Sequence, residues 1–318
     1  MNIIRFCNLF SPANIDNRLN NGKDQRMITM RERSAGITVA TIHNKFASAE
    51  VSLYGGQVLS FKPDDRDDIL FMSSACSFKP GKPIRGGIPI CFPWFGPRTD
   101  DPMLPQHGFA RTSTWSIISF EDEPENSTLI LGLSDTEDSR RIWPHSFAAA
   151  LAVTVSKKLS LTLSVTNTGG SPLSFTDALH AYFKVSQIES ARLIGLEQSE
   201  YRDLAALRSG AASEKPDMRI TQNGEIVFTE EIDRVYLTDS NIKIIDNIKP
   251  GQIIIRTEGF PNRIIWNPGQ VKGEAIADLG KKEWNSFVCM EAGAVDPNEI
   301  SVPPGATVCQ TMIIEPKR

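Results

Sequence analysis

The sequence predicts an all-β fold, because short strand-like runs dominate its 318 residues from Ile37 onward. Apolar and polar residues alternate within these runs, as they do in strands. Gly, Pro, Asn and Asp interrupt the runs roughly every 8–12 residues, the spacing typical of sandwiches and barrels. Few windows carry the 3.6-residue apolar repeat of a helix, and the best of them covers residues 197–207.

The clearest element is a hairpin over residues 148–165. Apolar residues alternate from 151 to 155 and from 159 to 165, and Ser156-Lys157-Lys158 between them predicts the turn. Asn167-Thr168-Gly169-Gly170 then ends the second strand. Further strand-like runs occur at 37–42, 49–61, 128–133, 226–229, 242–245, 253–256, 263–266 and 307–314.

The chain divides at about residue 36. Residues 11–35 are polar and rich in turn formers, and residues 3–10 are too short and too interrupted for a secretory signal. We therefore expect residues 1–36 to be a loosely ordered extension. Residues 37–318 contain no internal repeat, low-complexity tract or linker, so we expect one domain there.

Composition limits the classes of function. A hydrophobic content of 40% and a net charge of -4 are those of a soluble globular protein and argue against a general nucleic-acid surface. No apolar run approaches the roughly 20 residues that span a bilayer, so no membrane partner is expected. Five scattered cysteines without a CxxC pair favour free thiols in a reducing cytoplasm, and we expect a cytoplasmic monomer.

The segment from Arg85 to Arg111, RGGIPICFPWFGPRTDDPMLPQHGFAR, is the most informative part of the chain. Its glycines and prolines restrain a segment that carries guanidinium and imidazole groups, which favours an anion-binding pocket. The alternative is an irregular surface loop. Arg98 is followed by Asp100 and Asp101, which predicts a solvated ion pair for that arginine.

Two further segments carry acid–base chemistry. His180 lies in the strand-like DALHAYFKV and faces the same way as Ala178 and Tyr182; its imidazole could exchange a proton near neutral pH. Glu291 lies in FVCMEAGAV, where apolar neighbours are expected to withdraw its carboxylate from water and make it a better base. The alternatives are a hydrogen-bonded core histidine and an edge-strand glutamate.

Other polar and aromatic residues have a simpler interpretation. Asp233, between two short strands, could be a turn residue or pair with Arg234, and Asp177 is a similar case. Trp94 and Trp266 could stack on a sugar, but we expect both to pack in the core.

The sequence also argues against several sites. His43 and His145 have no acidic or cysteine neighbours at ligand spacing, so no metal is expected. The chain lacks a G-x-S-x-G elbow, a P-loop and a G-x-G-x-x-G turn, which disfavours common hydrolases, kinases and dinucleotide enzymes.

Taken in order, seven blocks resemble one family. The blocks are RGGIPICFPWFG, LPQHGFAR, ALHAYFKV, EIDRVY, WNPG, MEAG and PPGAT. Together they resemble the hexose-6-phosphate mutarotases, the glucose-6-phosphate 1-epimerase branch of the aldose 1-epimerase family. The resemblance runs from about residue 37 to the end. One local departure is at residues 193–203, where many relatives have a more regular turn followed by a tyrosine, a place that Tyr201 could fill.

The resemblance implies a fold, a site and a reaction. The fold would be an antiparallel β-supersandwich of the galactose-mutarotase-like type. His180 and Glu291 would be the catalytic pair, and no cofactor would be needed. The implied substrate-binding residues are Arg85, Gln106, Arg111 and Asp233, with the adjacent His107 as a further contact.

The chemistry suits these residue types. Exchanging the anomers of a hexose 6-phosphate requires opening the ring, rotating about C1–C2 and closing it. We hypothesise that Glu291 takes the O1 proton while His180 protonates O5 from the opposite side of the C1–O5 unit. Asp233 would accept a hydrogen bond from a ring hydroxyl, and Arg85 and Arg111 would bind the phosphate.

Three alternatives remain. An epimerase of unphosphorylated aldoses would have no use for two convergent arginines, and a non-catalytic sugar-binding module would not need both His180 and Glu291. A glycosidase or lyase could use Asp233 and Glu291 as its two carboxylates.

Overall fold

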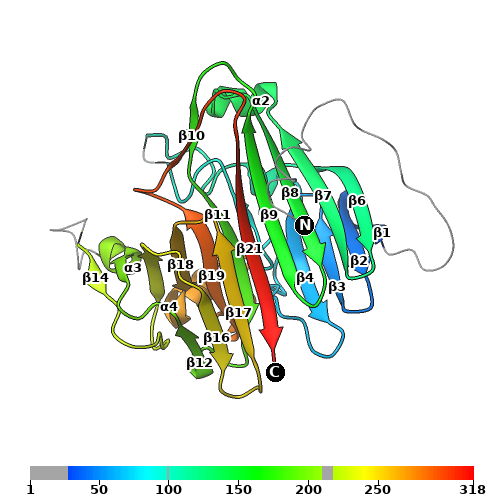
Figure 1. Ribbon diagram of the computed structural model, residues 1–318. Coiled ribbons are helices and arrows are strands. Elements are labelled where there is room, and N and C mark those ends of the chain that lie inside the picture. The colour runs from blue at the N-terminus through cyan, green and yellow to red at the C-terminus, as the bar shows by residue number, and fades with distance from the viewer. Residues whose placement is uncertain (1–27, 99, 210–217) are drawn as a thin grey trace.

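The computed structural model describes residues 28–98, 100–209 and 218–318 (Figure 1). Two large antiparallel sheets dominate it, which confirms the predicted all-β fold. The larger sheet has eight strands, in spatial order β12 (Ala191–Ile194), β16 (Ile242–Asp246), β17 (Gln252–Glu258), β21 (Thr307–Lys317), β9 (Leu159–Asn167), β8 (Phe147–Val155), β7 (Asn126–Ser134) and β6 (Ser116–Glu123).

The second large sheet lies behind the first in the view of Figure 1 and carries the candidate site. Its seven strands are, in spatial order, β14 (Ile220–Thr221), β13 (Glu200–Asp203), β15 (Ile232–Tyr236), β18 (Asn262–Asn267), β19 (Phe287–Ala294), β11 (Asp177–Lys184) and β5 (Ile90–Cys91).

Two smaller sheets and six short helical segments complete the described residues. The four-stranded sheet contains β1 (Ile28–Ser34), β2 (Ile37–His43), β3 (Ala47–Ser52) and β4 (Gln57–Pro63), and the two-stranded sheet contains β10 (Leu173–Phe175) and β20 (Ile300–Val302). The helical segments are η1 (Ala110–Thr112), α2 (Glu137–Ile142), η2 (Ile188–Ser190), α3 (Leu204–Arg208), α4 (Gly269–Ala275) and η3 (Glu283–Ser286). None of the helices in these residues is long and apolar enough to cross a membrane.

The core lies between the sheets and is built by alternation. In the predicted hairpin, Leu151 pairs with Leu163 and Val153 with Leu161, and all four side chains are buried. This confirms the hairpin, because a period-two apolar pattern places one face of each strand against the core. Gln310 on β21 donates to Asp177 on β11 at 3.2 Å, so a polar contact also joins the two large sheets.

Most of the predicted strand-like runs are strands, and two need correction. Residues 49–61 form two strands, β3 and β4, because a turn at Gly55-Gly56 reverses the chain. Residues 226–229 form no strand: Ile226 makes only an isolated bridge to Leu193. The helical window at 197–207 was only partly right, since β13 precedes the five-residue helix α3.

The expected extension at residues 1–36 lies outside the described residues as far as residue 27, and residues 28–34 form strand β1. Three cysteines, Cys76, Cys91 and Cys289, are free as expected. Cys309 is disulfide-bonded, so the expectation of free thiols was wrong there.

Candidate active site

His180 and Glu291 form a direct pair on the seven-stranded sheet. They lie opposite each other on the antiparallel strands β11 and β19, so their side chains project from the same face. The Nε2 atom of His180 is 3.2 Å from Oε1 of Glu291. The two groups therefore lie side by side, which corrects our expectation that they would flank a sugar from opposite sides.

The pair is almost fully withdrawn from water. Only 9% of the His180 side chain and 2% of the Glu291 side chain are exposed. Burial is the main cause that lowers the pKa of His180 to about 3, and it raises the pKa of Glu291 well above its usual value. Both shifts have the same cause and favour the neutral form of each group, which is the arrangement with the shared proton on the carboxyl.

One polar atom on each partner remains available. Nδ1 of His180 and Oε2 of Glu291 are buried without a hydrogen-bond partner in the described part of the chain. Buried polar atoms are rarely left unpaired, because the lost solvation costs about 1–3 kcal/mol each. Two such atoms on neighbouring residues indicate a site built to receive polar groups of a ligand.

Aromatic rings hold the imidazole in place. The ring of Tyr182, two residues along β11, stacks on His180 with centroids 4.9 Å apart and planes 11° apart. Trp266 approaches the same imidazole edge-on at 5.9 Å. Trp266 was expected to pack in the core or a turn; it is only partly buried and contacts Tyr182 and Phe287. Trp94 is buried as expected and donates to the carbonyl of Pro105.

His107 completes the surroundings of His180. Its backbone has φ of +66°, and its ring meets the His180 ring edge-on at 6.0 Å. Nδ1 of His107 accepts the N–H of Gly96 at 3.1 Å, so Nε2 carries the proton of the neutral ring. Burial, followed by Arg111, lowers the pKa of His107 well below its usual value, which makes it a neutral donor.

The glycines of the restrained segment are required by close backbone contacts. Gly86 has φ of +113° and Gly87 has φ of +61°. A Cβ atom would lie 2.5 Å from the carbonyl oxygen of Phe71 at Gly86, and 2.1 Å from that of Val58 at Gly87. Only glycine fits such positions. The segment then lies along β11, since the N–H of His180 donates to the carbonyl of Pro89.

Arg85 is paired with two other side chains of this chain. Its Nε donates to Asp278 and its Nη1 donates to the hydroxyl of Tyr182, at 3.1 and 3.0 Å. Tyr182 and Asp278 together raise the pKa of this guanidinium, against the effect of burial. The charge of Arg85 is therefore compensated within the chain by a carboxylate 193 residues away.

Arg111 is different. Its Nη2 donates to the backbone carbonyl of Gln106 at 2.6 Å, and no carboxylate pairs with it among the described residues. Burial lowers its pKa, as expected for a cation without a counter-ion. The Gln106 side chain is exposed at the edge of the site.

Asp233 approaches the pair from the side of Glu291. It lies within β15, not between strands as expected, opposite Trp266 of β18. It pairs with Arg208 at 2.7 Å and not with Arg234, which approaches Asp203 instead. Burial raises the pKa of Asp233, and the charge of Asp233 in turn raises that of Glu291.

Reasoning from the sequence missed two members of this cluster. Tyr182 could have been found, because it faces the same way as His180 on a strand. Asp278 follows α4 with no local pattern that signals a contact with Arg85. Arg98, by contrast, pairs with Asp100 as expected.

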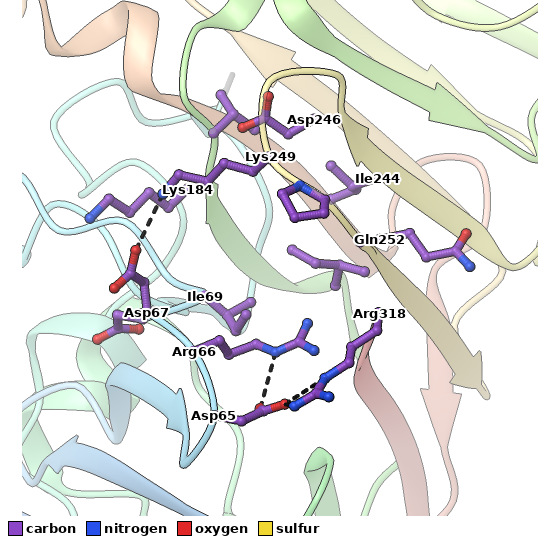
Figure 2. Close-up of a pocket in the computed structure, with 15 residues that line it drawn as sticks. Asp65, Arg66, Asp67, Ile69, Lys184, Ile244, Asp246, Lys249, Gln252 and Arg318 are labelled. Carbon is purple, nitrogen blue, oxygen red and sulfur yellow. Dashed lines mark hydrogen bonds and ion pairs between the residues drawn. The ribbon is translucent and has the colours of Figure 1, made fainter.

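A hollow of about 470 Å³ lies elsewhere, beside the C-terminal Arg318 (Figure 2). Several of its charged residues pair with one another, as Arg318 does with Asp65 and Lys249 with Asp67. None of the predicted site residues lines it. No group of three or more metal-ligating side chains occurs in the part of the chain that the structure describes.

Comparison with known proteins points to one family. The family model described as aldose 1-epimerase matches residues 38–315. A protein of Cenchrus ciliaris named "Putative glucose-6-phosphate 1-epimerase" is 42% identical over 270 residues, which are 81% of this chain and 78% of the relative.

Solved structures share the fold. The crystal structure of a protein described as a "putative mutarotase" from Salmonella typhimurium has a TM-score of 0.83 and 26% identity, covering 92% of this chain and 94% of that one. A galactose mutarotase related enzyme from Lactobacillus acidophilus has a TM-score of 0.69 at 15% identity, covering 88% and 97%. The galactose-mutarotase-like supersandwich expected from the sequence is thus confirmed.

Proposed function

Because this chain belongs to the aldose 1-epimerase family and is an isomerase of sugar anomers, we propose that its substrate is a hexose 6-phosphate and its catalytic pair is Glu291 and His180. The observation that carries the pair is the 3.2 Å contact between its two buried side chains. The relative from Cenchrus ciliaris, whose name specifies glucose 6-phosphate, supports the choice of substrate.

The side-by-side arrangement suits the two atoms that react. O1 and O5 are both bonded to C1, so they lie close enough for one group to reach each of them. Moving the shared proton from Glu291 to Nε2 of His180 produces a carboxylate and an imidazolium without changing the net charge of the site. The pair then contains the base and the acid that ring opening needs.

Ring opening follows in one balanced step. The Glu291 carboxylate takes the proton of O1, and the O–H electron pair forms the C1=O bond. The C1–O5 bond breaks, its electrons pass to O5, and O5 receives the proton of His180 Nε2. Rotation about C1–C2 followed by the reverse transfers gives the other anomer. Neutral His107, whose ring meets that of His180, would donate a further hydrogen bond to the substrate.

The phosphate would bind at Arg111. Its guanidinium has no carboxylate partner among the described residues, and guanidinium–phosphate hydrogen bonds are among the stronger ones. Arg85 has further N–H groups that could also bind the phosphate, although Asp278 already compensates its charge. Asp233, on the other side of Glu291, would accept a hydrogen bond from a ring hydroxyl, and the Gln106 side chain would meet the sugar at its exposed edge.

One observation favours a second candidate, an epimerase of unphosphorylated aldoses. Since Asp278 neutralises Arg85, the site presents one uncompensated guanidinium where the sequence suggested two. A neutral sugar would tolerate such a site better than one with two free cations.

NMR exchange between the α and β anomeric protons separates these candidates. With glucose 6-phosphate we expect faster exchange than with glucose, and Glu291→Gln should lower kcat by about 10²- to 10⁴-fold. The spontaneous rate without enzyme is the background. Equal acceleration of glucose would favour the second candidate, and steady release of reducing ends from oligosaccharides would favour a glycosidase.

Three further expectations stay predictions: a cytoplasmic location, a monomeric state and catalysis without a cofactor. Size-exclusion chromatography with light scattering measures the oligomeric state. Exchange rates after dialysis against a chelator test the third prediction, which requires an unchanged rate.

A further inference from the structure

We propose that the phosphate of the substrate, besides anchoring it at Arg111, moves the proton shared by Glu291 and His180 onto the histidine and so switches on the catalytic acid. This inference rests on the proposed function and deepens it, because it makes Arg111 a determinant of kcat as well as of binding.

The strand order places opposite charges at the two ends of the pair. β11, which carries His180, lies between β19 and β5. β5 belongs to the segment that begins at Arg85 and ends at Arg111. β19, which carries Glu291, is followed by β18 and then by β15 with Asp233. Cations therefore lie beyond the histidine and an acid lies beyond the glutamate.

The contacts around His180 agree with this order. Tyr182 stacks on the imidazole and accepts a hydrogen bond from Arg85. The segment of Arg111 is tied to β5, since the N–H groups of Phe109 and Ala110 both donate to the carbonyl of Phe92. Both arginines thus lie on the histidine side of the pair.

Charged and titratable groups surround the pair on its own strands, on the neighbouring strands and on the connecting segments. They are Tyr182 on β11, Cys289 on β19, Cys91 on β5, Asp233 on β15, and Arg85, His107 and Arg111 on the connecting segments. Burial raises the pKa values of both thiols and of the Tyr182 phenol, so these groups are neutral, as is His107.

Two of the remaining three charges are compensated. Arg85 pairs with Asp278 and Asp233 pairs with Arg208, whereas Arg111 has no ion pair within the described residues. Among these three charges, the one without an ion pair is therefore Arg111, at the histidine end of the pair. After burial, Arg111 is the next influence that lowers the pKa of His180, while for Glu291 it ranks behind Asp233.

The charge of Arg111 opposes the reactive form of the pair. A proton moved from Glu291 to His180 places a new positive charge near Arg111. A phosphate monoester carries a charge of about -1.5 to -2 at neutral pH, so its binding reverses the sign of the charge at that end. The substrate geometry fits, because the phosphate is attached through C6 and C5 to O5, the atom that His180 protonates.

Substrate specificity should then appear in kcat. A neutral hexose in the same place leaves Arg111 uncompensated and His180 unprotonated. Inorganic phosphate supplied separately should restore the missing charge.

The first test measures glucose anomer exchange by NMR with and without inorganic phosphate or sulfate. Both anions should raise the enzyme-catalysed rate about 10-fold, the change expected from about one pKa unit, and the effect should saturate. Sulfate is the essential control, because phosphate also catalyses mutarotation directly as a buffer. Rates without enzyme are subtracted.

Substitution of Arg111 gives the sharpest test. Arg111→Met keeps the bulk of the side chain but removes its charge, so the variant should turn over glucose faster than the wild type and lose activation by anions. Arg111→Lys keeps the charge, so its glucose rate should stay below that of Arg111→Met. If Arg111→Met does not fold, Arg111→Gln replaces it.

A second readout follows His180 itself. The chain has four histidines, and His43 and His145 lie outside the site as internal references. Sulfate should move the titration of the His180 ring protons to higher pH in the wild type, and Arg111→Met should show the same displacement without anion.

The outcomes separate this inference from the proposed function. If phosphate competes with glucose 6-phosphate but leaves both glucose exchange and the His180 titration unchanged, the switch is wrong and the phosphate site stands. If phosphate does not compete, and both sugars are handled alike, the proposed phosphate specificity fails as well.

Discussion

The strand pairs β8–β9 and β11–β19 have the same antiparallel architecture but bury different kinds of side chain. Both are long antiparallel pairs with buried side chains. In β8–β9 the inward positions are apolar, as at Val153 and Leu161, whereas β11–β19 buries His180 against Glu291. Burial of apolar groups stabilises the fold, and burial of ionisable groups costs free energy. The comparison therefore separates strands that stabilise the protein from the strands that carry the proposed catalytic pair.

The largest effect should come from making the second pair resemble the first. The double variant His180→Leu with Glu291→Met removes both ionisable groups at once, and we expect anomer exchange at the spontaneous rate. Its free energy of unfolding should stay unchanged or rise by about 1–4 kcal/mol, because the desolvation cost disappears. Urea unfolding and NMR exchange measure the two quantities.

The single variants serve as controls for that prediction. Each leaves one buried polar partner alone, so each should be less stable than the double variant. A double variant less stable than both single variants would mean that the pair stabilises the fold. It would contradict the claim that burial of these two ionisable groups costs free energy.

A cavity in the apolar pair should have the converse effect. Leu161→Ala on β9 should lower the free energy of unfolding by about 2–5 kcal/mol, since a buried leucine loses its contacts and leaves a void. The kcat of the folded fraction should not change, because β9 belongs to the sheet that lacks the site. Ser160→Ala, one position along the strand and only partly buried, is the matched control. A fall in kcat would contradict the separation.

The smallest effect concerns a buried carboxyl on the inner face of β11. Burial raises the pKa of Asp177 to about 7, against hydrogen bonds from Gln310 and the N–H of Ala294. Between about pH 4 and pH 7 the folded state therefore holds a proton that the unfolded state has lost. Stability from this group is complete at low pH and is lost as the pH rises through 7.

Asp177→Asn should remove that dependence. The amide cannot ionise, and its NH₂ group can donate to the unpaired Oε1 of Gln310. We expect the variant to gain stability over the wild type as the pH rises from 5 to 8, measured by urea unfolding. A difference that does not vary with pH would show that Asp177 does not titrate in this range.

Much of the fold could be predicted because strands leave a local signal. The alternation at residues 151–155 and 159–165 gives β8 and β9, since side chains on a strand point to opposite faces in turn. The run at 226–229 has similar composition but forms no strand. A segment with high strand propensity forms a strand only if it can pair with the edge of a sheet. The local sequence does not show whether such an edge lies nearby.

The candidate site, like the fold, was predictable where it depends on local sequence and not where it depends on contacts between distant segments. The sequence by itself determined that His180 and Tyr182 share a face, that Gly86 and Gly87 permit a tight backbone approach, and which family the chain resembles. These properties depend on neighbours along the chain, through the period of a strand and the absence of a Cβ atom.

Only the tertiary structure decided which groups meet. It places His180 in contact with Glu291. It also pairs Arg85 with Asp278 and Asp233 with Arg208. Arg111 pairs with no carboxylate in the described residues. Charge compensation depends on distances between segments remote in sequence, and those distances follow from strand register and sheet order. Two arginines that look alike in one sequence motif therefore differ in the charge that a ligand meets.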